Sequence, residues 1–207
     1  MALLKFEDNR VDPLIVDGYT YRTCQIGNQL WCAENLIVPL TGYSINPQFF
    51  RNNPDNLYGF GRYYNWEQAM SIEAKLPRGW RIPTKEDFVE LYNFCGGTDA
   101  SVLKKLRSTS GWTYADQNGT DDYGFTLNAY GGQYWESGYS GSFVNANICS
   151  VLWSKTEASE SSMWVFYNQR NGVCRVMTWN QGPNTGYTEC NRFSVRCVAT
   201  VKMKRGT

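Results

Sequence analysis

The chain has 207 residues, a formal net charge of +1 and no histidine. A nearly neutral charge without long runs of one sign excludes the electrostatic footprint of a dedicated nucleic-acid binder. The lack of histidine excludes Ser-His-Asp and Cys-His catalysis and histidine-ligated zinc. No apolar run approaches the roughly 20 residues of a membrane span, and no signal peptide is visible. We therefore expect synthesis in the cytoplasm, no nucleic-acid partner and no membrane span.

The first third of the chain predicts a hairpin and a short helix. Two alternating stretches within residues 19–36 flank Gly27-Asn28, a pair that suits the positive φ angles of a tight turn. Residues 39–62 are rich in proline and predict an irregular segment, and a short helix should follow over residues 66–72.

The strongest helix signal begins at Thr84, which forms a capping-box pattern with Asp87 three residues later. An apolar stripe with helical spacing follows, and Gly96-Gly97 should end the helix. A second short helix should begin at Asp99. The stripe consists of Phe88, Leu91, Tyr92 and Cys95.

The rest of the chain predicts strands over residues 150–157, 162–169, 172–179 and 193–201. In the last one, Phe193, Val195 and Cys197 alternate with other residues, so one face should be buried. Pairing of this strand near the first hairpin would bring the termini close together. The order predicts a single α+β domain over residues 1–207, with short helices packed on a small antiparallel sheet and long loops.

A polar segment with a few aromatic residues, residues 167–191, precedes the last strand. Exposed segments on a rigid scaffold commonly carry recognition, and Tyr, Trp and Asn are effective contact residues. The candidate ligand-binding residues are Tyr167, Asn168, Arg170, Asn171, Arg175, Met177, Trp179, Asn180, Asn184, Tyr187, Glu189 and Asn191.

A structural interpretation of the same segment places Trp179 and Tyr187 partly in the core and treats its Asn and Gly residues as turn formers. Residues 131–142 leave a similar choice between a surface insertion and a second rim of the binding face. Calcium needs about six to eight oxygen ligands, and Glu189 is the one acid near WNQGPN (179–184), the stretch that is similar to a lectin calcium loop. We therefore expect no metal site.

Seven cysteines make an odd number, and none forms a CxxC motif. They are either reduced and packed as small apolar residues, or part of an extracellular protein with one or two disulfides. The cysteines are Cys24, Cys32, Cys95, Cys149, Cys174, Cys190 and Cys197.

Seven collinear stretches carry a family resemblance: IGNQLWCAENL (26–36), YGFGRYYNWEQA (58–69), PRGWRIPTKEDF (77–88), LKKLRSTSGW (103–112), GFTLNAYGG (124–132), WSKTE (153–157) and FSVRCV (193–198). Together they resemble the Fibrobacter succinogenes major paralogous domain of bacteria and phages. The resemblance implies a C-type-lectin-like fold, in the variant found in formylglycine-generating enzymes.

The resemblance also implies a function. Several members are variable proteins of diversity-generating retroelements, in which hypervariable residues just before the final strand form an exposed ligand-binding face. Residues 163–198 are the corresponding region here. We therefore expect a non-enzymatic protein, without cofactor, that binds a protein or glycan ligand on a cell surface, itself displayed on a phage tail or a bacterial surface.

Two alternatives remain. One is a non-diversified bacterial surface adhesin or carbohydrate-binding paralogue. The more remote one is an enzyme of the formylglycine-generating type, which holds copper on a thiol pair near its C-terminus; here the fold would have to bring Cys174 beside Cys190. The sequence predicts neither the identity of the ligand nor the oligomeric state.

The chain departs from the family pattern in three ways, one of which is that Cys174 and Cys190 match no family cysteine. Many members carry a cysteine where Leu76 stands, and the resemblance implies that it pairs with the cysteine at the Cys197 position. Arg192 stands where a glycine usually precedes the phenylalanine. Because Leu76 replaces the usual partner, we expect Cys197 to have no disulfide partner.

Overall fold

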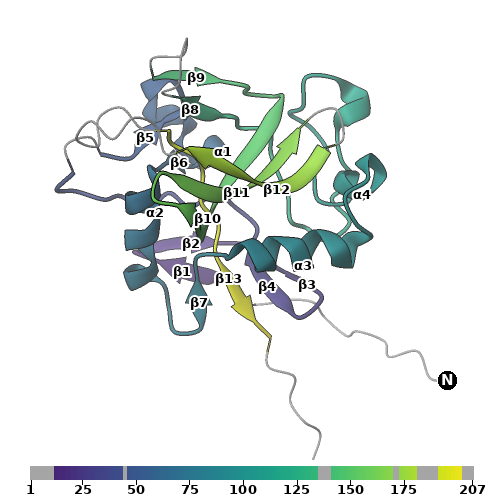
Figure 1. Cartoon of the computed structure of the whole chain (residues 1–207), viewed down its shortest axis with the longest axis horizontal. Helices are drawn as coiled ribbons and strands as arrows, with labels where there is room; N and C mark the ends of the chain where they lie inside the picture. The colour runs from purple at the N-terminus through teal and green to yellow at the C-terminus, as the bar shows by residue number, and fades with distance from the viewer. Residues whose placement is uncertain (1–11, 44–45, 135–140, 170–172, 181–190, 202–207) are drawn as a thin grey trace, which may run out of the picture.

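The computed structural model describes residues 12–43, 46–134, 141–169, 173–180 and 191–201 (Figure 1). It combines short helices with small antiparallel sheets, which confirms the α+β class. Among these described residues, no helix is both long and apolar enough to cross a membrane.

The N-terminal part contains two hairpins where the sequence predicted one. β3 (Thr23–Ile26) and β4 (Gln29–Cys32) form the predicted hairpin. The predicted range 19–36 made β2 (Tyr19–Tyr21) part of this hairpin. Instead, β2 pairs with β1 (Leu14–Val16). The turn between β1 and β2 is Asp17-Gly18, with φ angles of 52° and 82°. Two positive φ angles at an Asp-Gly pair are typical of a type I′ hairpin turn.

The last strand joins the first hairpin in one sheet. β13 (Val198–Thr200) lies between β4 and β7 (Trp80–Arg81), which gives a four-stranded sheet of order β3-β4-β13-β7 (Figure 1). Its register places Val198 opposite Trp31. The predicted pairing of the C-terminal strand with the first hairpin is therefore confirmed. The chain ends themselves lie outside the described residues.

The stretch before β13 runs through the interior of the protein. Every residue from 191 to 199 is buried. This confirms the predicted burial of Phe193, Val195 and Cys197. The prediction that one face alone is buried is wrong, because Ser194 and Arg196 on the other face are buried as well.

α3 (Lys85–Cys95) begins and ends as the sequence predicts. Thr84 and Asp87 form a complete capping box, and Gly96 ends the helix in the left-handed region at φ 117°. Three residues of the predicted stripe are buried, namely Phe88, Leu91 and Cys95.

The helix α3 packs against a three-stranded sheet of order β10-β11-β12. One face of this sheet shares a core cluster with α3, to which Leu152, Phe166 and Val176 contribute. The opposite face belongs to a second cluster with Trp153 and Phe193. The strands lie close to their predicted ranges: β10 (Cys149–Ser159), β11 (Ser162–Gln169) and β12 (Val173–Asn180).

The remaining elements are short. The predicted helices over 66–72 and after Asp99 are confirmed as α2 and α4. The helices are α1 (Leu57–Phe60), α2 (Trp66–Ser71), α4 (Ala100–Lys104), and the 3-10 turns η1 (Phe50–Asn52), η2 (Pro54–Asn56), η3 (Ile72–Lys75) and η4 (Ala115–Gln117). Two further strand pairs are β5 (Gln48–Phe49) with β6 (Arg62–Tyr63), and β8 (Gly132–Tyr134) with β9 (Ser142–Val144).

Candidate functional site

The described part of the predicted binding segment lies mainly on β12, the outer strand of its sheet. β12 pairs residue for residue with β11. Alternation places Arg175, Met177 and Trp179 on one face of the strand, and Val176 and Thr178 on the other. Arg175 and Thr178 are exposed, whereas Met177 and Trp179 are half-buried. The strand therefore offers accessible side chains at the margin of the sheet. Thr178 was not among the predicted contact residues, although the same alternation could have indicated it.

Trp179 is anchored in the protein by other aromatic rings. Its ring centroid lies 5.5 Å from Tyr134, 5.7 Å from Tyr167 and 5.5 Å from Phe193. Pairs at such distances add stabilisation beyond the area that they bury. For Trp179 the structural interpretation, a ring partly in the core, is therefore correct, and only part of the indole is accessible to a ligand.

Three predicted contact residues lie inside the protein. Tyr167 is 9% exposed, and Asn168 and Asn191 are 0% exposed. The side-chain oxygen of Asn168 accepts a hydrogen bond of 3.0 Å from the buried Arg107. Burial raises the pKa of the Tyr167 hydroxyl to about 12. The expectation that these three residues form an exposed surface is wrong, because the folded chain covers them.

For the other predicted contact residues, a role in ligand binding stays a prediction. Asn180 is described only as the backbone end of β12, and five more lie outside the described residues: Arg170, Asn171, Asn184, Tyr187 and Glu189. Residues 181–190 connect β12 to the buried stretch that begins at Asn191. Both attachment points of this connection are thus fixed by the fold. In the second predicted rim, Tyr134 is buried and residues 135–140 are not described.

A polar pocket forms a second candidate site, which the sequence analysis did not identify. It has a volume of about 180 Å³, and its walls come from three stretches that are far apart in the sequence. The ring of Tyr58 is 82% exposed and lies at this pocket. The main lining residues are Arg22, Glu34, Asn35, Tyr58, Asn128 and Tyr130. Three of the stretches that carry the family resemblance therefore meet here.

A buried arginine supports the wall of this pocket. Arg196 is 1% exposed, and its Nε donates to Oδ1 of Asn35 at 3.0 Å. Its two terminal nitrogens donate to the backbone carbonyls of Phe125 and Thr126. Burial lowers the pKa of the guanidinium. The fixed Asn35 side chain also donates to the carbonyl of Phe60 at 3.0 Å, so it is oriented from both ends.

Thr126, beside this arginine, has a strained backbone. Its φ angle is 50°, which is unusual for a β-branched residue. The carboxylate of Asp121 holds it there by accepting from its N–H at 2.6 Å and from its hydroxyl at 2.7 Å. Strained residues of this kind cluster at binding and active sites. Thr126 does not line the pocket itself, but its carbonyl accepts from Arg196, which supports the pocket wall.

Among the described residues, no group of three or more His, Cys, Asp or Glu side chains could hold a metal ion. The side chains of Cys174 and Cys190, the pair that a copper enzyme would need, are not described. The expectation that the chain binds no copper therefore stays a prediction.

Comparison with known proteins gives one match. A family model described as Fibrobacter succinogenes major domain matches residues 24–199. The match starts in β3 and ends in β13, so it covers the β12 surface and the lining of the polar pocket except Arg22. No curated protein and no solved structure matches the chain.

Proposed function

Because the chain belongs to the Fibrobacter succinogenes major domain family, we propose that it is a non-enzymatic binding protein with a C-type-lectin-like scaffold. The observation that carries this proposal is the way in which residues 181–190 are attached. They follow the outer strand β12 and precede a stretch, residues 191–199, that is buried throughout. A segment between two fixed ends can change its sequence while the fold persists, as recognition segments on rigid scaffolds do.

The proposed ligand-binding surface consists of the exposed side chains of β12 and residues 181–190. Arg175 and Thr178 contribute from the described part, from opposite faces of this outer strand. The ligand would be a protein or a glycan on a cell surface, and the protein would be displayed on a phage tail or a bacterial surface. Within the region 163–198, we propose that a diversity-generating retroelement varies the exposed positions, whereas buried residues such as Phe193 and Arg196 stay constant.

The test of this proposal is the DNA next to the gene. A variable protein of this kind requires a reverse transcriptase gene nearby and a near-copy of the codons for about residues 163–198. Finding both would support the proposal. A neighbourhood with neither would remove diversification and leave a fixed binding protein.

The polar pocket supports a second candidate, a non-diversified carbohydrate-binding paralogue. Sugars are bound by amide and charged side chains together with an aromatic ring, and the pocket presents Asn128, Glu34 and the exposed Tyr58. A glycan array with the wild-type chain and with Asn128→Ala and Tyr58→Ala distinguishes the two. Loss of glycan binding in these variants would favour the pocket; loss in Arg175→Ala and Thr178→Ala would favour the β12 surface.

A further inference from the structure

Two cysteines lie directly opposite each other at the start of the last strand pair. In the β4–β13 register, Val198 opposes Trp31, and one step further along Cys197 opposes Cys32. The backbone N–H of Cys32 donates to the carbonyl of Cys197 at 2.9 Å. The antiparallel pairing therefore continues one position beyond the end of β13 and includes both cysteines.

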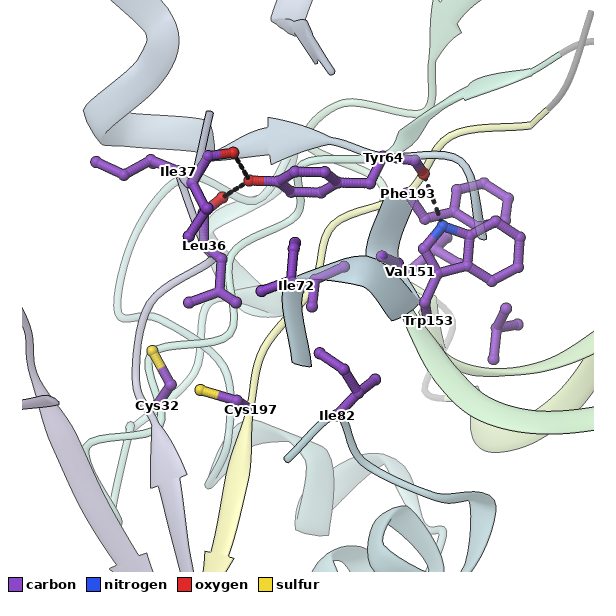
Figure 2. Packing of buried hydrophobic residues seen from close by; sticks show 14 of the residues in the cluster. Cys32, Leu36, Ile37, Tyr64, Ile72, Ile82, Val151, Trp153, Phe193 and Cys197 are labelled. Carbon is purple, nitrogen blue, oxygen red and sulfur yellow. Dashed lines mark hydrogen bonds between the residues drawn. The ribbon is translucent and has the colours of Figure 1, made fainter. Parts of the chain in front are cut away.

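This position has the geometry that a disulfide needs. Directly opposed residues joined by backbone hydrogen bonds have Cα atoms about 5.5 Å apart, and disulfides span Cα distances of about 4.4–6.8 Å. Both side chains belong to the same buried cluster, so both point to the same face of the sheet. Figure 2 shows the two sulfur atoms side by side.

The other described cysteines lie elsewhere. Cys24 belongs to the second core cluster, on the opposite face of the same sheet, together with Cys95 of α3. Cys149 belongs to the same core cluster as Cys32 and Cys197, but it begins β10 in a different sheet. Among the described residues, Cys32 is thus the cysteine placed to react with Cys197.

We propose that Cys32 and Cys197 form a disulfide when the protein folds in an oxidising compartment. Thiolate exchange with a small-molecule or enzyme disulfide would first give a mixed disulfide at one cysteine. Attack by the other cysteine then forms the Cys32–Cys197 bond and releases the oxidant as two thiols. Two protein thiols are oxidised and one external disulfide is reduced.

The bond would fasten the end of the chain to the first hairpin. It replaces the cross-link that the resemblance assigns to a cysteine at position 76, where this chain has Leu76 packed against the same cluster. Both thiols are free in the structure, so the expectation that Cys197 has no disulfide partner stays a prediction, which the proposed bond would overturn.

Burial determines when the bond can form. Both cysteines are 0% exposed, and burial raises the pKa of the Cys197 thiol well above its ordinary value. Because neither thiol is accessible, the folded, reduced protein should react slowly with oxidants, even though, against the effect of burial, the neighbouring Cys197 lowers the pKa of the Cys32 thiol. The bond should instead form during folding, before the core closes.

The experiment refolds the full chain from denaturant in a buffer of oxidised and reduced glutathione, and in dithiothreitol as the control. Free thiols are then alkylated in denaturant and the protein is digested without reductant. We expect a peptide cross-linked through Cys197. Trypsin leaves Cys24 and Cys32 on one peptide, residues 23–51, so the same digest is made from Cys24→Ser. The cross-link should persist in Cys24→Ser and disappear in Cys32→Ser.

A second measurement covers the case in which Cys32→Ser does not fold. The oxidised wild-type chain should melt on the order of 10 °C above the reduced chain, since a disulfide that closes a long loop restricts the unfolded state. Alkylated Cys197 in the wild-type chain refolded in glutathione would overturn the proposal. A cross-link from Cys197 to any cysteine other than Cys32 would also overturn it.

Discussion

The ring of Trp179 stands at 77° to the ring of Phe193, with 5.5 Å between their centroids. This edge-to-face contact joins the outer strand β12 to the buried stretch that leads into β13. The residue that the sequence offered as a binding anchor is therefore also part of the scaffold. Binding and folding are separable at some positions of the proposed surface and coupled at others.

Trp179→Ala is expected to destabilise the fold as well as to reduce binding. Its ring is half-buried among three aromatic rings, so we expect a loss of about 2 kcal/mol in the free energy of unfolding, below the 3–5 kcal/mol typical of a fully buried ring. The exposed Arg175→Ala should stay within about 0.5 kcal/mol. Urea denaturation of both variants measures this, and an unchanged midpoint for Trp179→Ala would contradict the account.

Trp153 provides the matched control for a fully buried indole. It is 0% exposed, and its Nε1 donates to the carbonyl of Tyr64 at 2.7 Å (Figure 2). Trp153→Ala should cost about 3–5 kcal/mol. Equal losses for Trp153→Ala and Trp179→Ala would show that Trp179 belongs wholly to the core and leave little of it for a ligand.

Asp87 should make stability depend on pH. Burial opposes its ionisation, but the salt bridge with Arg81 and the hydrogen bonds from Thr84 outweigh burial and hold the pKa of Asp87 below its usual value. A lowered folded-state pKa adds stability above the unfolded pKa of about 3.9, and this contribution is lost as the pH falls through the folded pKa.

Asp87→Asn should therefore cost about 2 kcal/mol at pH 7, through the lost cap and the lost ion pair. The difference in the free energy of unfolding between Asp87→Asn and the wild-type chain should shrink as the pH falls below about 4. Denaturation at several pH values measures it. Asp17→Asn removes a carboxylate that pairs with Lys75 and is 35% exposed, against 9% for Asp87, and it should change stability by less than about 1 kcal/mol. A pH-independent gap for Asp87→Asn would show that the carboxylate charge does not matter.

Arg196 should tolerate no conservative replacement. Lysine keeps the charge but lacks the planar fork that reaches Asn35, Phe125 and Thr126 together. Unpaired buried acceptors are costly, so Arg196→Lys should lose about 3 kcal/mol or more. Arg22→Lys, at an exposed ion pair with Glu34, should lose less than about 1 kcal/mol. Similar losses for both would mean that the buried network contributes little.

Local patterns predicted the elements whose signals lie within a few residues. The capping box at Thr84, the apolar stripe of α3 and the strands β10 to β12 are examples. The hairpin β1–β2 could also have been found, because Asp17-Gly18 is a strong turn signal. Arg196 shows the limit: its alternation in the sequence suggests an exposed side chain, but its partners come from residues 70 to 161 positions away.

The candidate sites were predicted only in part, because local sequence patterns do not report contacts between distant segments. Composition marked residues 167–191, but composition does not show which side of a strand faces the core, and Asn168 and Asn191 are buried. Trp80, in the family stretch 77–88, is half-buried beside Leu30 and Pro77. The polar pocket and the Cys32–Cys197 pair depend on contacts between distant segments, which no local pattern reports.

The most direct test of the central proposal is to sequence this gene from many cells or phage particles of one population. We predict that substitutions concentrate at the codons for Arg175, Thr178 and residues 181–190. The codons for the buried Asn168, Phe193 and Arg196 should stay unchanged. Substitutions spread evenly along the gene, or as frequent at those buried positions as at the exposed ones, would contradict the proposal that the fold displays a diversified binding surface.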